Sequence, residues 1–161
     1  ELLVGVVDRG CRELDIPIPA LSVEPGRAIA GPSTFTLYEV GTVKPVRVGE
    51  GFDRLYVAVD GGMSDNIRAA LYGADFSCTL ASRRSDAPAV LSRLVGKHCE
   101  SGDVVVKDEF MPNDVGPGDL VAVPGTGAYC RSLANTYNHV PRAAVVAVRD
   151  GQARVVLRRE T

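Results

Sequence analysis

Five turn-rich segments of the sequence gather residue types that bind anions or transfer protons. Arginine side chains can hold carboxylates or phosphates, whereas cysteine and carboxylic acids can exchange protons with a substrate. A short glycine turn can also cradle a phosphate with its backbone N–H groups. The five segments are Glu24-Pro-Gly-Arg27, Asp60-Gly-Gly-Met-Ser-Asp-Asn-Ile-Arg68 with Tyr72, Gly96-Lys-His-Cys-Glu-Ser-Gly-Asp103, Pro117-Gly-Asp119 and Gly125-Thr-Gly-Ala-Tyr129.

Each segment taken alone also has a structural explanation. Pro25-Gly26 fits a simple turn, and Gly61-Gly62 fits a bulge or a close approach of two backbones. A plain glycine turn is the commoner outcome for Gly125-Thr-Gly127 than a phosphate cradle. The arginines of the first two segments fit surface ion pairs, and the cysteine of the third fits a buried thiol. Only the combination of the five segments is therefore informative.

The charge of the chain argues against strongly anionic partners. Its 18 lysines and arginines are almost balanced by 20 aspartates and glutamates, for a formal net charge of −2. We therefore expect no binding to nucleic acid or to an anionic membrane surface. The apolar runs are also far shorter than a membrane-spanning helix requires.

The cysteines indicate a reduced, cytoplasmic protein without a metal site. Cys11, Cys78, Cys99 and Cys130 lie far apart, with no C-x-x-C pair. Such spacing is typical of free thiols in the cytoplasm. His98 is the single histidine next to a cysteine, and adjacent residues of a strand face opposite sides, so that pair is a poor chelate.

From residue 33 onward the pattern is almost entirely that of short strands separated by glycine and proline. We expect strands at residues 33–43, 54–59, 77–82, 89–95, 104–110, 119–123, 143–148 and 153–158. The last two flank Asp150-Gly151, a dipeptide typical of a tight hairpin. This spacing predicts an all-β sandwich or barrel.

The N-terminal stretch has a different character. Apolar residues recur at helical spacing over residues 1–16, which predicts an amphipathic helix that Pro17 and Pro19 terminate. A short strand is expected at residues 21–24, followed by a Pro25-Gly26 turn. This piece is too small to form a domain alone.

In order and spacing, the five segments resemble the diaminopimelate decarboxylase family of fold type III, alanine-racemase-like enzymes that use pyridoxal phosphate. The resemblance runs from about Leu21 to the end of the chain. It implies that residues 1–30 are the last helix and strand of a (β/α)8 barrel that binds the cofactor. Residues 31–161 would then form a C-terminal β-barrel domain, so the expected fold is mainly β.

The resemblance also implies an activity. Family members decarboxylate meso-diaminopimelate to L-lysine, with pyridoxal phosphate as the electron sink for the carbanion. Cys99 would donate the proton that replaces CO2, a role that suits a thiol because its ordinary pKa is about 8.5. The family works as a homodimer in which Cys99 and Glu100 would reach the active site of the partner subunit.

The remaining site residues follow from the same resemblance. Their shared task is to hold the charged ends of the substrate and the phosphate of the cofactor. Expected substrate-binding residues are Arg27, Arg68 and Tyr72 for carboxylates, Glu100 for the distal ammonium group, and Tyr129. Expected cofactor-binding residues are Glu24, Pro25, Gly26, Arg27 and Tyr129.

One part of the family's catalytic set has no counterpart here. Lys44, Lys97 and Lys107 do not match the lysine that forms the Schiff base with the cofactor. We therefore expect that lysine to lie outside these 161 residues, and residue 1 to be a cut point inside a longer protein.

Two alternatives remain open from the sequence. Related decarboxylases of ornithine or arginine usually carry Asp where Glu100 follows the cysteine, and their substrates have less need of Arg68 and Tyr72. A non-catalytic β-barrel binding module would also fit the strand pattern, but it has no need of the set of charged residues around Cys99.

Overall fold

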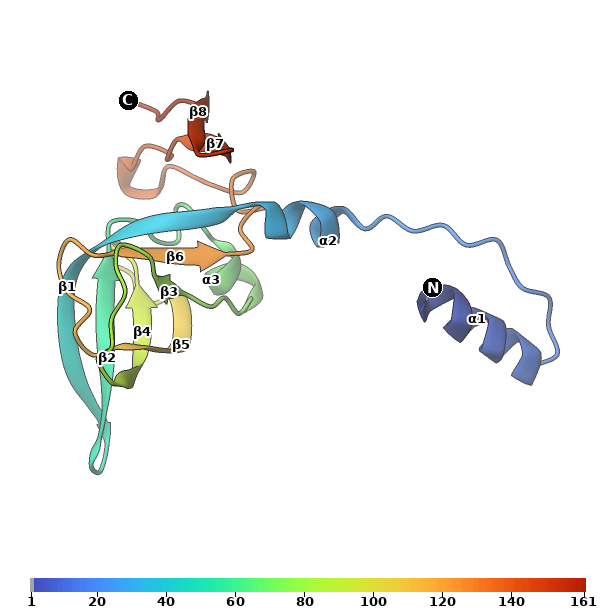
Figure 1. Ribbon diagram of the computed structural model, residues 1–161, viewed down its shortest axis with the longest axis horizontal. Coiled ribbons are helices and arrows are strands. Elements are labelled where there is room, and N and C mark those ends of the chain that lie inside the picture. Colours follow the sequence, from blue (N-terminus) through green and yellow to red (C-terminus); the bar gives the residue numbers. More distant parts are fainter. Residues whose placement is uncertain (1) are drawn as a thin grey trace.

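The computed structural model describes residues 2–161, so the expected helix start at Glu1 lies outside the described residues. Helix α1 spans Leu2–Glu13, close to the predicted 1–16. It lies apart from the strands in Figure 1, and its apolar residues Leu2, Leu3 and Val6 are all more than half exposed. The amphipathic helix is therefore confirmed, but its apolar stripe has no partner among the described residues.

The expected strand at residues 21–24 does not form. Residues 16–25 carry neither helix nor strand, and in Figure 1 this segment runs as an extended link between α1 and α2. A strand is stable only when a neighbouring strand accepts and donates its backbone hydrogen bonds. No such neighbour lies beside residues 21–24 in the part of the chain that the structure describes.

Six strands build the main sheet, in the order β3-β6-β1-β2-β4-β5. Their bounds are β1 Phe35–Gly49, β2 Phe52–Val59, β3 Thr79–Leu80, β4 Ala89–Val95, β5 Val104–Pro112 and β6 Leu120–Pro124. All neighbours run antiparallel except β2 and β4, which are parallel. Cys78, next to β3, brings the two edges together: its N–H donates to Glu109 Oε2 of β5 (3.3 Å), so the sheet nearly closes into a barrel.

The long strand β1 turns the sheet into this shape. Its first residues pair with β6 from Phe35 to Glu39, whereas its later residues pair with β2. Within the β2 pairing, a register shift between Val40 and Val43 follows directly after the end of the β6 pairing, as expected where a bulge bends a strand. Apolar side chains from all the longer strands fill the interior, among them Val40, Val57, Leu94, Val105 and Val121.

Most strand predictions are confirmed, with differences at their ends. Strand β4 has the predicted bounds, β1 is longer than predicted, and β3 keeps only two residues. Two short helices were not predicted: α2 at Gly26–Ala30, where a turn was expected, and α3 at Arg68–Tyr72. Both are single turns, too short for a helical repeat to show in the sequence.

A separate two-stranded sheet closes the chain. Strands β7 (Val145–Arg149) and β8 (Gln152–Leu157) form the predicted hairpin. Asp150 (φ 51°) and Gly151 (φ 72°) both adopt the left-handed backbone that a tight two-residue turn requires. In Figure 1 this hairpin lies at the top, above the beginning of β1, whereas the turn between β1 and β2 lies at the bottom.

One buried carboxylate joins the two loops that carry most of the candidate residues. We call residues 60–67 the glycine loop and residues 96–103 the cysteine loop. Asp103 is 3% exposed. Its Oδ1 accepts the Met63 N–H (2.6 Å) and its Oδ2 accepts the His98 N–H (2.8 Å). The Lys97 N–H also donates to Gly61 O (3.0 Å), so the loops are held edge to edge.

Glycine is required at two positions of this joint. A Cβ on Gly62 or on Gly96 would overlap the Asp103 carboxyl group, and Gly62 also has a positive φ of 154°. A close approach was expected at Gly61-Gly62, but the group that comes close to these glycines is a side chain and not a second backbone. The close approach allows the carboxylate to reach backbone N–H groups of both loops.

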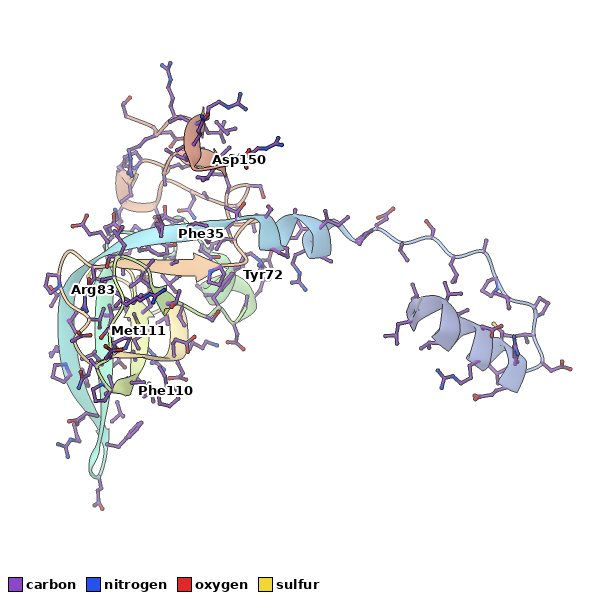
Figure 2. The ribbon with its side chains drawn as sticks, in the orientation of Figure 1. Phe35, Tyr72, Arg83, Phe110, Met111 and Asp150 are labelled. Carbon is purple, nitrogen blue, oxygen red and sulfur yellow. The ribbon has the colours of Figure 1, made fainter. Side chains whose placement is uncertain are left out.

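The segment Pro117-Gly-Asp119 has a structural role. Asp119 accepts two hydrogen bonds from the Arg83 guanidinium, from Nε and Nη2 (2.9 Å each), and one from Ser82 Oγ (2.9 Å). The Arg83 guanidinium lowers the pKa of Asp119 to about 2. The same arginine binds Asp114, and Figure 2 shows Arg83 over the strands of the barrel. This cluster fixes the loop after β3 to the turn before β6.

Near the edge of the barrel, Asp119→Asn should lower the free energy of unfolding of the full-length protein at neutral pH. The variant's free energy of unfolding should also fall less steeply than that of the wild type as the pH is lowered. The folded pKa of Asp119 (about 2) lies below the ordinary 3.8, so its contribution is complete above 3.8 and is lost as the pH falls towards 2. Urea unfolding followed by circular dichroism, from neutral pH down to about pH 3, measures this. Asp86→Asn is the control, and equal acid dependence of all three proteins would contradict the assignment.

At the joint of the two loops, Gly96→Ala should displace the Asp103 carboxylate and destabilise the protein by about 1–3 kcal/mol. Gly102→Ala lies in the same cysteine loop, but its Cβ would meet nothing within 4 Å. Thermal unfolding measures the stability, and the alkylation rate of the exposed Cys99 thiol, resolved by peptide mass spectrometry, reports the loop. Equal behaviour of the two variants would show that the joint does not depend on this close approach.

Candidate functional site

An open hollow lies between α2 and Tyr129. Its lining comprises Glu24, Pro25, Gly26, Arg27, Ala28, Ile29 and Tyr129. These include all five residues expected to bind the cofactor. The N–H groups of Arg27 and Ala28 have no hydrogen-bond acceptor within residues 2–161, and they lie on an exposed surface. The hollow can therefore accept a phosphate or another anion.

The turn at Gly125-Thr-Gly127 holds Tyr129 in place beside α2. Its Thr126 N–H donates to Thr34 O (3.1 Å), and its Gly127 N–H donates to Gly31 O (3.1 Å). A Cβ on Gly127 would overlap Ala30 O. Because these N–H groups already bind the chain itself, the turn is structural and does not cradle a phosphate through them.

Tyr129 has an unusual backbone for a bulky residue. Its φ is 68°, in the left-handed region that residues other than glycine seldom occupy. Ala128 and Cys130 on either side are buried, whereas Tyr129 is 53% exposed. The left-handed turn therefore directs the ring out of the core and towards the hollow that it lines. Backbone strain of this kind clusters at binding sites.

Arg68 is the one buried residue among the arginines and lysines of residues 2–161. It is 9% exposed at the start of α3. Its Cζ lies 5.6 Å from the centre of the Phe76 ring and 5.9 Å from that of Tyr129. Within residues 2–161, no carboxylate lies at ion-pair distance from its guanidinium. A buried cation without a counter-ion suits an anionic ligand.

The surroundings of Arg68 are polar and buried. Asn66 Oδ1 accepts the Arg68 N–H (3.3 Å) and the Cys130 thiol (3.4 Å), and its Nδ2 has no partner in the described chain. Burial raises the pKa of the Cys130 thiol, and the positive charge of Arg68 opposes that rise. Cys130 therefore remains a protonated thiol that packs against the arginine.

Tyr72 ends α3 one turn after Arg68, so both belong to the same short helix. Its side chain is 66% exposed, and Figure 2 shows it at the surface by α3. Gly73 follows with a φ of 62° and stops the helix at this point. The phenol is therefore free to contact a ligand that Arg68 binds.

Cys99 and Glu100 lie at the exposed tip of the cysteine loop. Cys99 is an exposed free thiol, whereas Cys11, Cys78 and Cys130 are buried. The suggestion that Cys99 is a buried core thiol is therefore wrong. Neither residue has a side-chain hydrogen bond or ion pair to Arg27, Arg68 or Tyr129 within the described residues. Arg27 and Tyr129 line one hollow, and Arg68 lies against the Tyr129 ring.

Several residues that organise this region have no role that was predicted from the sequence. Asp103 joins the loops, His98 is buried behind Cys99, and Phe76 flanks Arg68. The sequence contains a signal for Asp103, because this residue ends a segment that begins with Gly96. The structure shows that this glycine is needed to make room for the Asp103 carboxyl group. Phe76 carried no such signal, since its contact with Arg68 arises only when the chain folds.

The three lysines of the chain lie away from the lining of the hollow. Lys44 lies in β1, Lys107 in β5 and Lys97 in the cysteine loop, and none of them lines the hollow beside Tyr129. Residues 2–161 contain no group of three or more potential ligands that could hold a metal ion. No helix in the same range is both long and apolar enough to cross a membrane.

Comparison with known proteins places this architecture in a family. Residues 29–127 match the family described as "Pyridoxal-dependent decarboxylase, C-terminal sheet domain". The diaminopimelate decarboxylase of Mycobacterium tuberculosis is 67% identical over 146 residues, which cover 91% of this chain and 33% of that protein. The Bacillus subtilis enzyme of the same name is 45% identical over 161 residues, 100% of this chain and 36% of its own length.

Comparison with solved structures supports the same family. The crystal structure of diaminopimelate decarboxylase from Helicobacter pylori complexed with L-lysine superposes with a TM-score of 0.73 at 33% identity. The match covers 86% of this chain and 32% of that one. The chain thus spans about a third of the length of the relatives that it matches. It belongs to the pyridoxal-dependent decarboxylases and contains the C-terminal sheet domain of that family.

Proposed function

We propose that this chain is the C-terminal part of a pyridoxal-phosphate-dependent diaminopimelate decarboxylase, which converts meso-diaminopimelate to L-lysine and CO2. The names of its relatives and the L-lysine in the H. pylori structure support this substrate and product. The single observation in the chain itself that carries the proposal is Arg68. Its buried guanidinium has aromatic neighbours but no carboxylate of its own within the described residues.

Arg68 and its neighbours would bind the distal end of the substrate. Diaminopimelate carries an ammonium and a carboxylate at each end, so the distal pocket needs a cation and an anion. A buried guanidinium binds a carboxylate through two parallel hydrogen bonds, and Tyr72 can add a phenolic donor from the next turn of α3. Glu100 at the exposed loop tip would bind the distal ammonium group, and Arg27 would hold a second carboxylate.

The hollow beside Tyr129 suits the phosphate of the cofactor. Pyridoxal phosphate, when bound, withdraws electrons from the carbon that loses CO2. The exposed N–H groups of Arg27 and Ala28 and the Arg27 guanidinium offer donors to a phosphate, with Glu24, Pro25 and Gly26 forming the wall. Tyr129 would contact cofactor and substrate from the other side. We expect the lysine that binds the cofactor to come from outside residues 1–161, in an adjoining (β/α)8 barrel to which residues 1–30 belong.

Cys99 would deliver the proton that replaces CO2 on the substrate carbon. Its thiol is exposed at a loop tip, which the Asp103 joint holds firmly to the barrel. Within residues 2–161 no hydrogen bond or ion pair joins Cys99 or Glu100 to Arg27 or Tyr129, and we propose that both residues enter the active site of a partner subunit in a homodimer. The four free cysteines support a cytoplasmic location for the enzyme.

Two other functions are less well supported. Ornithine and arginine have no distal carboxylate, so an enzyme specific for them would leave the buried Arg68 without a counter-ion. A non-catalytic binding module is at odds with the family to which the chain belongs. Arg68 and Glu100 therefore favour a diaminopimelate decarboxylase over an ornithine or arginine decarboxylase and over a binding module.

In the full-length enzyme, Cys99→Ala should lower kcat by about 10²–10⁴-fold and change KM little, because the thiol acts after the substrate is bound. Steady-state CO2 release measures both constants. Ser101→Ala alters the same exposed tip without removing a proton donor and is the matched control. Turnover close to that of the wild type in Cys99→Ala would make Cys99 a surface residue without a catalytic role.

Subunit mixing separates action within a subunit from action across the interface. Cys99→Ala subunits are mixed with subunits that lack the cofactor-binding lysine. If Cys99 serves the partner's site, each mixed dimer regains one complete site and activity returns. Absence of recovery after verified exchange would contradict the shared-site arrangement.

Arg68→Met keeps an unbranched side chain but removes the charge. It should reduce kcat/KM for diaminopimelate by at least about 100-fold. The ratio of kcat/KM for diaminopimelate to that for lysine or ornithine should therefore fall. The desolvated carboxylate of diaminopimelate loses its partner, whereas the other two substrates have no distal carboxylate to lose. The measurement is kcat/KM for all three substrates in wild type and variant.

Two results would count against this assignment. An equal loss for all three substrates would make Arg68 a structural residue. Failure of the wild-type enzyme to form L-lysine from meso-diaminopimelate would overturn the proposed function itself.

A further inference from the structure

His98 is a buried imidazole placed directly before the exposed Cys99. It is 8% exposed, and both of its ring nitrogens have partners from other segments of the chain. Its Nε2 lies 2.9 Å from Ser64 Oγ of the glycine loop. Its Nδ1 lies 3.5 Å from Asn138 Nδ2, and its ring stands 5.2 Å from that of Tyr137. One side chain therefore touches two distant segments.

The partners of His98 favour one tautomer of its ring. Asn138 Nδ2, an amide nitrogen that donates hydrogen bonds, lies 3.5 Å from His98 Nδ1, a long contact that fits Nδ1 as the acceptor. The proton then resides on Nε2 and is donated to Ser64 Oγ. The two contacts together favour the Nε2–H tautomer of His98.

The contacts of His98 extend an already rigid junction. Asp103 Oδ2 accepts the His98 N–H on the backbone side (2.8 Å). The Asn135 N–H donates to Ser64 O (3.0 Å), which ties residues 135–139 to the glycine loop independently. Asn138 has a left-handed backbone (φ 54°), which asparagine adopts more readily than most residues. The imidazole thus lies where three segments meet.

We propose that His98 is a positioning residue for the decarboxylation. Its Nε2–H imidazole sets the position of Cys99 and Glu100 relative to the glycine loop, which leads directly into Arg68. Ser64 and Arg68 are four residues apart on one continuous segment, so a displacement of Ser64 would move Arg68 in this subunit's proposed site and Cys99 in the partner's. This inference rests on the proposed function, in which Cys99 donates a proton and Arg68 binds a carboxylate.

The test uses the full-length enzyme with two substitutions of His98. His98→Leu fills a similar volume without hydrogen bonds, whereas the amide nitrogen of His98→Gln can still donate to Ser64 Oγ. We expect His98→Leu to lower kcat for diaminopimelate by about 10- to 100-fold, because a displacement near 1 Å is sufficient for such a loss. His98→Gln should recover most of that loss. His139→Asn is the control: it replaces the chain's other histidine, which is exposed, and Asn tolerates its left-handed backbone.

A second readout does not depend on turnover. Nitrogen-15 NMR of the histidine side chains distinguishes the Nε2–H from the Nδ1–H form. His98→Gln assigns the imidazole signal of His98, because that signal disappears in this variant. We expect the Nε2–H form at neutral pH, and loss of that preference in Ser64→Ala and Asn138→Ala.

The outcomes separate this inference from the proposed function. An inactive wild-type enzyme would overturn the proposed function. An active wild type with near-normal kcat and KM in His98→Leu, or an Nδ1–H tautomer at His98, would overturn the positioning role alone. If His98→Leu does not fold, Ser64→Ala decides: a lower kcat with unchanged thermal stability supports the role, and an unchanged kcat overturns it.

Discussion

The arrangement of the candidate site depends on one buried carboxylate. Asp103 accepts backbone N–H groups from Met63 and His98, and so joins the loop that leads into Arg68 to the loop that presents Cys99. A buried carboxylate is stable only when hydrogen bonds replace the water that it has lost. The charge therefore holds the two loops at one fixed separation, and glycine at positions 62 and 96 is the steric condition for this contact.

The second organising feature is a positive charge that the described chain leaves without a counter-ion. Arg68 lies between the rings of Phe76 and Tyr129, and cation–π contacts offset only a small part of the cost of burying it. A carboxylate that enters this place gains a partner already desolvated and fixed in orientation. Tyr129, with its left-handed backbone, belongs both to this place and to the hollow beside α2. The proposed substrate and cofactor sites therefore share one tyrosine.

The barrel supports these features in a simple way. Its bent strand β1 pairs with β6 and β2, and the loops that carry the candidate residues extend from the strand ends. The Asp119–Arg83 cluster and the turn at Gly125–Gly127 fix other loops by bonds within the chain, so they contribute to structure and not to chemistry. A loop can hold a reactive group in a precise position only when a rigid scaffold supports the loop. The five turn-rich segments therefore differ in role: some hold loops in place, and others carry the candidate binding and catalytic residues.

The sequence alone determined the strand pattern, the hairpin at Asp150-Gly151 and the order of the five segments, because alternation, turn chemistry and motif spacing are local properties. It also pointed to Arg27, Arg68, Cys99, Glu100 and Tyr129 through their resemblance to one family. Only the tertiary structure decided that Arg68 is buried while Cys99 is exposed, since burial depends on which distant residues pack together. The same holds for His98, whose contacts with Ser64 and Asn138 span 34 and 40 positions of the chain. The strand expected at residues 21–24 did not form for a related reason, because a strand depends on a partner that no local sequence can supply.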